Sequence, residues 1–201
     1  GARTILDIGT GTGVIAIMLA QKSSAHIDAI EIDGPSCEQA RENVLNSPWP
    51  ERIHIIHQSL QDFSITTDKK YDLIVSNPPY FEEQEGASTD ARTIARRTCE
   101  LTHMHLIDGV NRLLTSEGQF WLILPSQEGI GFKSLAEHQG LYCKHCVHIV
   151  TRTGKPEKRV ILCLSRLVRE TAHEELIIQL DQNHFTPEYI KLTEDFYLGL
   201  K

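Results

Sequence analysis

Short apolar runs alternate with segments of helical period over most of the chain. The runs are bounded by glycine, proline or charged residues, as buried strands usually are. We predict strands at residues 4–8, 27–32, 53–57, 71–76 and 119–124. We predict helices at residues 14–21, 37–46 with Ser36 as N-cap, 92–114 with a break near Thr102, and 131–138. This alternation predicts an α/β fold, in which a doubly wound, mostly parallel sheet carries helices on both faces.

A hairpin is predicted after the last of these helices. Two β-prone runs, residues 141–151 and 158–165, flank the turn sequence Gly154-Lys155-Pro156. We therefore expect a seven-stranded sheet with an antiparallel hairpin at one edge. Residues 169–201 add a short strand near 176–179 and a helix after Pro187, so we interpret residues 1–201 as one domain with a C-terminal strand–helix appendage.

Composition narrows the class of protein. The chain has 201 residues, of which 40% are hydrophobic and 23% charged, and these values are ordinary for a globular domain. No apolar run approaches the roughly 18 residues of a membrane span. Five scattered cysteines do not resemble a disulfide framework, so we expect a cytoplasmic protein. The sequence does not give the oligomeric state, and we favour a monomer. The net charge of −7 gives no overall attraction to nucleic acid, so an RNA substrate would need a local basic patch.

Asp7 precedes a glycine-rich loop that joins the first strand to the first helix. Gly9, Gly11 and Gly13 allow a sharp turn and a close approach of the backbone to a ligand. The dinucleotide fingerprint is Gly-x-Gly-x-x-Gly, and Val14 stands where its third glycine would be, which argues against NAD. The alternative at this point is a loop with no ligand.

Glu31 lies at the end of the second predicted strand. A carboxylate in this place can accept hydrogen bonds from both ribose hydroxyls of a nucleotide. Asp7, just before the loop, suits the ammonium at the methionine end of S-adenosyl-L-methionine. For Glu31 alone, a solvated charge at a strand end is equally consistent.

Asn77-Pro78-Pro79-Tyr80 follows the apolar strand 71–76. Two prolines end the strand and stiffen the loop, leaving carbonyl groups free to accept hydrogen bonds. The Asn77 amide oxygen and the Pro78 carbonyl could each accept one hydrogen of an exocyclic amine, while Tyr80 stacks on the ring that carries it. The alternative is a turn with Tyr80 covering the core.

Together these motifs resemble the class I S-adenosylmethionine-dependent methyltransferases that modify amino nitrogens. More closely, the chain is similar to the bacterial tRNA adenine-N6 methyltransferases that act on a valine tRNA at the adenine next to the anticodon. The matching stretches are Leu6-Asp7-Ile8-Gly9, Asn46-Ser47-Pro48-Trp49, Ser76 to Tyr80, and Glu194-Asp195-Phe196-Tyr197-Leu198. The resemblance spans essentially the whole chain.

The resemblance implies a Rossmann-like fold, S-adenosyl-L-methionine as cofactor and the anticodon region of a tRNA as partner. It implies Asn77, Pro78, Pro79 and Tyr80 as catalytic residues. It implies a cofactor-binding set of Asp7, Gly9, Gly11, Gly13, Glu31, Ser59, Leu60 and Asn77.

Two departures from the family pattern affect this interpretation. The family has a segment before the first strand that helps cover the cofactor, whereas this chain enters that strand almost at once, so we expect that an upstream segment is missing. The family also carries an acid after the third strand, near the cofactor adenine, where this chain has Ser59. We predict that Asp62 or a backbone group holds the adenine amine instead.

Two alternatives to a tRNA methyltransferase remain open at this stage. One is an amino-methyltransferase that uses the same loop on a protein glutamine or on DNA adenine. The other is a non-catalytic RNA-binding protein that kept the fold, against which the intact glycine loop and Asn77 argue.

Other clusters give weaker signals. Cys143, His145, Cys146 and His148 could suggest a metal, but residues 143 and 146 of a regular strand face opposite sides, so we predict no metal site. Two sets of basic residues are candidates for phosphate contacts: Arg92, Arg96 and Arg97, and the hairpin residues Arg152, Lys155, Lys158 and Arg159.

Overall fold

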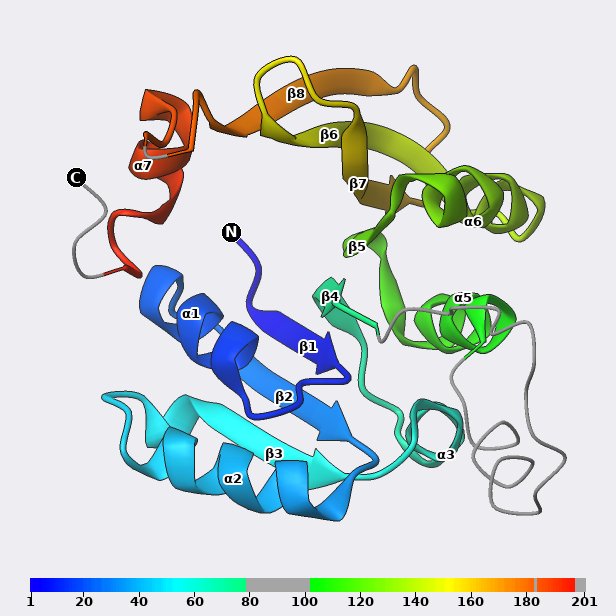
Figure 1. The fold of residues 1–201 in the computed structure, drawn as a ribbon. Helices are drawn as coiled ribbons and strands as arrows, with labels where there is room; N and C mark the ends of the chain where they lie inside the picture. The colour runs from blue at the N-terminus through cyan, green and yellow to red at the C-terminus, as the bar shows by residue number, and fades with distance from the viewer. Residues whose placement is uncertain (79–101, 183, 198–201) are drawn as a thin grey trace, which may run out of the picture.

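The computed structural model describes residues 1–78, 102–182 and 184–197. These residues form one sheet of eight strands in the order β3-β2-β1-β4-β5-β7-β6-β8 (Figure 1). The first five in this order run parallel: β3 (Ile53–His57), β2 (His26–Glu31), β1 (Thr4–Ile8), β4 (Tyr71–Ser76) and β5 (Leu114–Pro125). The hairpin strands β7 (Glu157–Ser165) and β6 (Tyr142–Arg152) are antiparallel, and β8 (Ala172–Gln179) adds parallel to β6.

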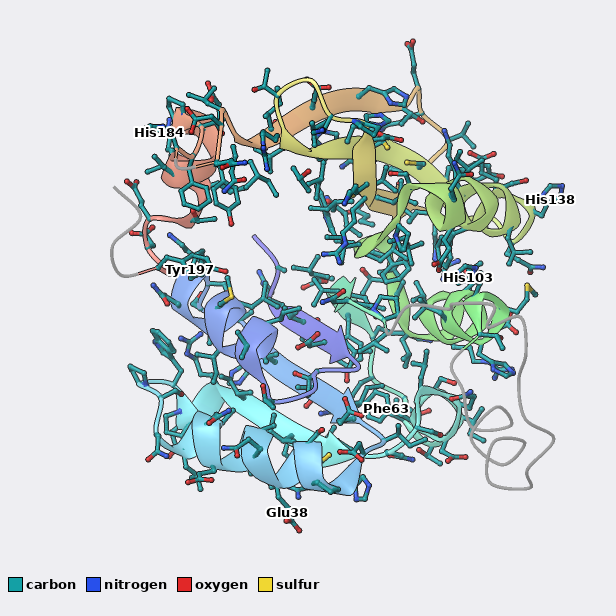
Figure 2. The ribbon with its side chains drawn as sticks, viewed as in Figure 1. Glu38, Phe63, His103, His138, His184 and Tyr197 are labelled. Carbon is teal, nitrogen blue, oxygen red and sulfur yellow. The ribbon has the colours of Figure 1, made fainter. Side chains whose placement is uncertain are left out.

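Helices cover both faces of the sheet and enclose two hydrophobic cores. One core lies under α1 (Val14–Lys22) and α2 (Gly34–Leu45), where Ala16, Ala20 and Ala40 are buried against the strands. The other lies under α3 (Leu60–Thr66), α5 (His103–Leu113) and α6 (Ser126–His138), and it includes Phe63, labelled in Figure 2. Alternate residues of β1 serve the two cores, since Ile5 joins the first and Leu6 the second.

The register of the parallel strands brings their carboxyl ends to one edge. Ile8 at the end of β1 pairs with Ile30 of β2 and with Ser76 of β4, and Glu31 pairs with His57 of β3. The strand order reverses direction between β1 and β4, and ligands of open α/β sheets bind at such a point. The segments that follow β1, β2 and β4 therefore meet where a ligand is expected.

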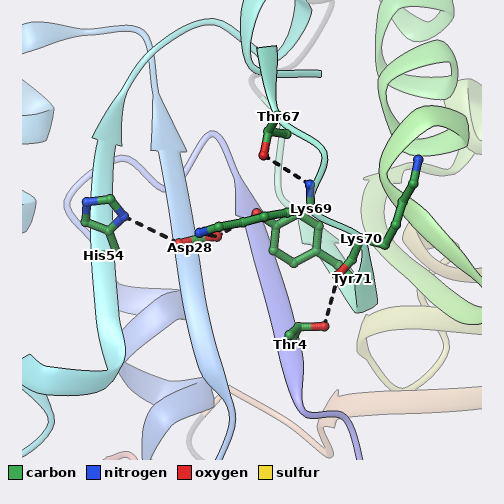
Figure 3. Close-up of polar contacts among 7 residues, drawn as sticks. All are labelled: Thr4, Asp28, His54, Thr67, Lys69, Lys70 and Tyr71. Atoms are coloured by element: carbon green, nitrogen blue, oxygen red, sulfur yellow. Dashed lines mark hydrogen bonds and ion pairs between the residues drawn. The ribbon is translucent and has the colours of Figure 1, made fainter. Parts of the chain in front are cut away.

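A buried carboxylate of β2 contacts side chains of β3 and β4 at some distance from that edge. Asp28 of β2 accepts a hydrogen bond of 2.6 Å from the Tyr71 hydroxyl of β4 and one of 2.7 Å from Lys69, and it lies 3.5 Å from His54 of β3 (Figure 3). Burial and this bond raise the pKa of Tyr71, so the phenol stays protonated. Because a buried charge needs partners, the contact keeps β2 and β4 aligned on either side of β1.

The C-terminal segment crosses back to α1. After α7 (Pro187–Thr193), Asp195 forms an ion pair with Lys22, and its carbonyl accepts a hydrogen bond of 2.9 Å from Gln21. The Lys22 ammonium also lies over the Phe196 ring, 5.2 Å from its centroid, and Tyr197 lies at the same junction (Figure 2). The segment 169–197 thus pairs through β8 with β6 and contacts α1 at its far end.

The α/β class, the mostly parallel sheet and the hairpin are confirmed, but three details differ from prediction. The described sheet has eight strands instead of seven, because β8 extends the sheet beyond the hairpin. The N-cap of α2 is Asp33, which accepts a hydrogen bond of 2.9 Å from the Ser36 amide, so the assignment of Ser36 was wrong. The seven-residue helix α3 was not predicted.

Candidate functional site

The glycine loop after β1 adopts a backbone that residues other than glycine rarely adopt. Gly9, Gly11 and Gly13 have φ angles of 70°, 55° and 83°. The amides of Gly9 and Thr10 donate to the Ile30 carbonyl of β2 at 3.0 and 3.1 Å, which turns the loop over the end of the sheet.

The three glycines serve different purposes. A Cβ atom added at Gly9 or Gly11 would meet nothing within 4 Å, so at these positions the backbone faces open space that a ligand could fill. A Cβ atom at Gly13 would lie 3.3 Å from the Ala40 Cβ, so this glycine lets α1 begin close to α2. Asn43 of α2 steadies the loop by donating to the Thr12 carbonyl at 2.9 Å.

Glu31 is bonded directly to the glycine loop. Its Oε2 accepts from the Gly11 amide at 2.9 Å, and its Oε1 accepts from the Ile32 and Asp33 amides at 2.8 and 2.9 Å. The carboxylate is therefore held in one orientation: Oε1 already accepts two amides, whereas Oε2 accepts one and can still accept a hydroxyl proton. The two motifs that the sequence predicted separately form one hydrogen-bonded unit.

Asp7 lies beneath the loop and is fully buried. Its Oδ2 accepts a hydrogen bond of 2.6 Å from the Thr10 hydroxyl, and its Oδ1 is buried without a hydrogen-bond partner of good geometry among the described residues. Burial raises the pKa of Asp7 from 3.8 to about 6, although hydrogen bonds from Thr10 and the Ala16 backbone limit the rise. Asp7 presents no atom at the surface, so its carboxylate lies below the loop, and its predicted role toward an ammonium stays a prediction.

Asn77 follows β4 at the same edge. Its side chain is exposed, whereas Pro78 is buried, and the preceding Ser76 hydroxyl donates to the Ile8 carbonyl at 3.0 Å. That bond joins the end of β4 to the end of β1, so Asn77 emerges beside the glycine loop. Pro79 and Tyr80 lie outside the described residues, as do Arg92, Arg96 and Arg97.

Ser59 and Asp62 form one local unit at the start of α3. The Ser59 hydroxyl accepts from the Asp62 amide at 3.0 Å and donates to the Asp62 carboxylate at 2.7 Å, so Ser59 caps the helix. Leu60 is buried in the core, which leaves only its backbone available to a ligand. Gln58 ties this segment to the site, because its amide donates to the Glu31 carbonyl at 2.9 Å.

Comparison with known proteins identifies this arrangement. The Methyltransferase small domain family matches residues 1–142. A tRNA1(Val) (adenine(37)-N6)-methyltransferase of Bacteroides fragilis is 40% identical over 200 residues, covering 98% of this chain and 83% of its own length. The enzyme of the same name from Yersinia pestis is 43% identical over 200 residues, covering 98% of this chain and 81% of its own length.

The chain belongs to the Methyltransferase small domain family.

Solved structures support the fold of this methyltransferase independently of sequence. A predicted O-methyltransferase from Agrobacterium tumefaciens superposes with a TM-score of 0.72 at 18% identity, covering 95% of this chain and 88% of that one. A ribosomal protein L11 methylase from Lactobacillus delbrueckii gives a TM-score of 0.58 at 21% identity, covering 82% and 70% of the two chains.

The residues at the edge fit the S-adenosyl-L-methionine that the fold and the relatives imply. Open space at Gly9 and Gly11 leaves room for a ligand against the backbone. Glu31 is fixed with acceptor capacity to spare, and Asp7 supplies a buried acceptor below the loop. Sequence reasoning did not find Thr10 or Asn43, which hold the loop in place, since a threonine and a helical asparagine carry no distinctive pattern.

The cysteines and histidines of β6 are arranged differently from the prediction. A register shift between Cys143 and His145 interrupts the alternation, and Cys143 and Cys146 lie in the same buried core, so the argument that they face opposite sides was wrong.

The basic residues Lys155, Lys158 and Arg159 of this methyltransferase are exposed at the hairpin tip, and Arg152 is partly buried beside them. No helix among the described residues is long and apolar enough to cross a membrane.

Proposed function

We propose that this chain transfers a methyl group from S-adenosyl-L-methionine to the N6 amine of an adenine in tRNA1(Val), as its relatives are named for doing. The observation that carries the proposal is the meeting of three segments at one sheet edge: the glycine loop, Glu31 bonded to it at 2.9 Å, and Asn77. When bound, the cofactor supplies a methyl group already activated by its positive sulfonium.

In this proposal Glu31 and the glycine loop bind and orient the methyl donor, S-adenosyl-L-methionine, and so form the donor site. Glu31 Oε2 would accept from a ribose hydroxyl while keeping its bond to Gly11, and Oε1 would stay bonded to the Ile32 and Asp33 amides. Asp7 acts from beneath the loop, where its negative charge favours the donor's ammonium through the field or a bridging water. At the start of α3, Asp62, held by Ser59, or a backbone group would accept the amine hydrogens of the cofactor adenine.

Asn77 and Pro78 position the attacking amine. Its lone pair is delocalised into the adenine ring, so the nitrogen is a weak nucleophile. An acceptor for each amine hydrogen, the Asn77 Oδ1 and the Pro78 carbonyl, favours a pyramidal nitrogen with its lone pair directed at the methyl group. The target base must leave its stack to reach this edge, and we assign Tyr80 and Pro79 to the wall that receives it.

Binding of a tRNA requires a local patch of positive charge on the protein surface, because the protein as a whole carries a net charge of −7. The exposed hairpin residues Lys155, Lys158 and Arg159 are our candidates for contacts to phosphates near the anticodon. We further propose a cytoplasmic monomer in which residues 1–201 act as one domain and 169–201 are its appendage.

Substitution of Asn77 by alanine tests the catalytic assignment. Single-turnover methylation of tRNA1(Val) should slow by about 10²–10³-fold, because one oriented hydrogen bond to the reacting group is lost. Cofactor affinity, measured by calorimetry, should change little. Asn46→Ala is the matched control, since Asn46 is an exposed amide at the end of α2 and should leave the rate unchanged.

Substrate class is tested in the same assay by offering tRNA1(Val), bulk protein and duplex DNA with labelled donor. Label in tRNA at adenine N6 supports the proposal. Near-wild-type turnover of Asn77→Ala at saturating donor and tRNA would remove Asn77 from the catalytic machinery. Label in protein or DNA alone would replace the substrate while keeping the reaction class.

A further inference from the structure

Three potential metal ligands converge on the face of the hairpin that α6 covers. Cys146 and His148 are two residues apart on β6, so their side chains share a face, and His173 of β8 pairs in register with Cys146. One ligand atom from each of the three lies within 4.8 Å of the other two. The two strands that carry them, β6 and β8, lie side by side in Figure 1.

His148 is oriented as metal-binding histidines commonly are. Its Nδ1 lies 2.5 Å from the Glu157 carboxylate of β7, and its Nε2 lies 2.9 Å from His173 Nδ1. A carboxylate on one ring nitrogen fixes the tautomer and leaves the other nitrogen to accept a proton or bind a metal. Nε2 of His148 and Nδ1 of His173 face each other, so one metal ion can bind both nitrogens once they move slightly apart.

A cavity of about 370 Å³ opens in front of this cluster, between the hairpin and α6. It is lined by Cys146, His148, Glu157 and His173 together with α6 residues that include Ser126, Lys133 and Glu137. The cavity gives an ion a path from solvent and leaves room for a water molecule as a further ligand. Lys133 is a cation on this wall, and the carboxylates of Glu137 and Glu157 line the same cavity and offset its charge.

We propose that Cys146, His148 and His173 bind a divalent transition metal ion, with Zn²⁺ preferred, and that Glu157 orients His148. A donor set of one sulfur and two imidazole nitrogens suits Zn²⁺, which takes Zn–S bonds of about 2.3 Å and Zn–N bonds of about 2.0–2.1 Å in a tetrahedron. In a tetrahedron those lengths place ligand atoms about 3.3–3.6 Å apart. The observed separations, 2.9 Å for the two imidazole nitrogens and at most 4.8 Å overall, bracket that range, so small rotations of the side chains bring them to it.

The ion would fasten the outermost strand of the sheet. β8 is an edge strand whose first four residues are exposed. Its residue His173 is distant in sequence from the other two ligands, Cys146 and His148, which lie close together on β6. An ion shared by β6 and β8 ties the C-terminal appendage to the hairpin. This role is separate from the donor site, because none of the proposed ligands belongs to the edge formed by the glycine loop, Glu31 and Asn77.

Metal titration of the full chain, first stripped with a chelator, tests the proposal. We expect one Zn²⁺ per chain, and Co²⁺ in its place should give the thiolate-to-metal charge-transfer band and strong visible bands of tetrahedral coordination. Glu157→Gln should lower Zn²⁺ affinity by about 10–100-fold, as expected for loss of an orienting carboxylate. Cys146→Ser should abolish the charge-transfer band, and His173→Ala should lower affinity more than Glu157→Gln does.

His145→Ala is the matched control, because His145 is on the same strand but the opposite face, 3.2 Å from Glu174. It should bind Zn²⁺ like the unmodified chain. Binding that survives His173→Ala unchanged, binding lost equally in His145→Ala, or no binding beyond the chelator wash would overturn the proposal. His173 is exposed on an edge strand, so this variant is expected to fold even if Cys146→Ser does not, and retained S-adenosyl-L-methionine affinity would confirm an intact fold.

Discussion

The parallel part of the sheet, β3-β2-β1-β4-β5, and the hairpin part, β7-β6-β8, hold their polar groups in different ways. At the carboxyl edge of the parallel part, Glu31 and Ser76 bond to backbone groups, as Glu31 does to the Gly11 amide at 2.9 Å, although Asp7 and Thr10 form a side-chain pair there. In the hairpin part, side chains bond to side chains, as His148 does to Glu157 and His173 at 2.5 and 2.9 Å. A hydrogen bond from a side chain to the backbone requires one particular residue, whereas a bond between two side chains requires a particular residue on each of two strands.

The comparisons divide the chain at the same place. The Methyltransferase small domain family matches residues 1–142, and β6 begins at Tyr142. The tRNA1(Val) methyltransferases match 98% of the chain, and therefore include the hairpin part as well.

The largest expected effect concerns Asp7, whose burial costs stability in the parallel part. A carboxyl group with a raised pKa stabilises the fold fully below its unfolded value of 3.8 and loses that contribution as pH rises through about 6. This change in pKa corresponds to about 3 kcal/mol. Asp7→Asn should therefore flatten the pH dependence of unfolding between about pH 4 and 6, and be more stable than the unmodified chain at pH 7.

Urea unfolding of both chains at several pH values measures this difference. Donor affinity should fall in the same variant, since the negative charge beneath the loop is lost. If Asp7→Asn unfolds at a lower urea concentration than the unmodified chain at pH 7, the prediction is wrong. Burial of the Asp7 charge would then have no net cost to the free energy of unfolding.

A pair of glycines sharpens the comparison between the two parts. A Cβ atom at Gly129 of α6 would lie 2.3 Å from Val160 Cγ2 of β7, so Gly129→Ala should destabilise the chain by about 1–3 kcal/mol through overpacking. It should leave donor affinity unchanged, because the glycine loop is untouched. Gly13→Ala, with its positive φ and an Ala40 contact of 3.3 Å, should weaken stability and donor affinity together. Thermal unfolding and calorimetry on both variants separate the two outcomes.

Glu31→Ala should act on binding more than on folding. Loss of a charge-assisted acceptor should weaken S-adenosyl-L-methionine binding by about 1–3 kcal/mol. The Gly11 amide also loses its partner, so the loop becomes less well ordered. Calorimetric titration measures the affinity, with the exposed Glu38→Ala of α2 as control (Figure 2). Equal affinity in the two variants would remove Glu31 from the donor site.

The smallest effect is expected where the two parts meet through the C-terminal segment. Lys22 and Asp195 form an exposed ion pair, with 49% and 57% of their side chains accessible, so Lys22→Ala should cost less than about 1 kcal/mol. High salt should reduce even that difference. Lys191→Ala on exposed α7 is the control in thermal unfolding. A loss of several kcal/mol would mean that docking of this segment is central to folding.

Much of the parallel part could be predicted because its strands are buried apolar runs with clear ends. Residues 4–8, 53–57 and 71–76 were predicted at the observed bounds of β1, β3 and β4, since glycine or polar residues end them. The helix α3 was missed because only Leu60 and Phe63 of its seven residues are buried, which gives too little period to detect. Similarly, α6 begins five residues earlier than predicted, at Ser126, because Gly129 and Gly131 weaken its helical pattern.

The candidate site was predictable where one motif lies on one loop, and less so where distant residues meet. The Glu31–Gly11 bond joins two predicted motifs, but neither motif alone indicates it. His173 lies in an exposed run, Ala172 to Glu175, that carries no strand pattern, so only the register of β8 against β6 brings it to Cys146. The predicted roles of Asn77, Pro78, Pro79 and Tyr80 stay predictions.

The central position of β1 has a consequence for how the chain is made. β1 pairs with β4, and the Asp72 carboxylate of β4 accepts from the Arg3 amide at 2.8 Å across 69 residues of sequence. A ribosome that adds roughly 5–20 residues per second therefore exposes β1 about 3–14 seconds before β4. During that interval β2 covers one side of β1, while the other side, with its row of free amides and carbonyls, stays open to any passing strand. Nascent chains of this protein should accordingly need protection from aggregation most while residues 26–76 are being synthesised.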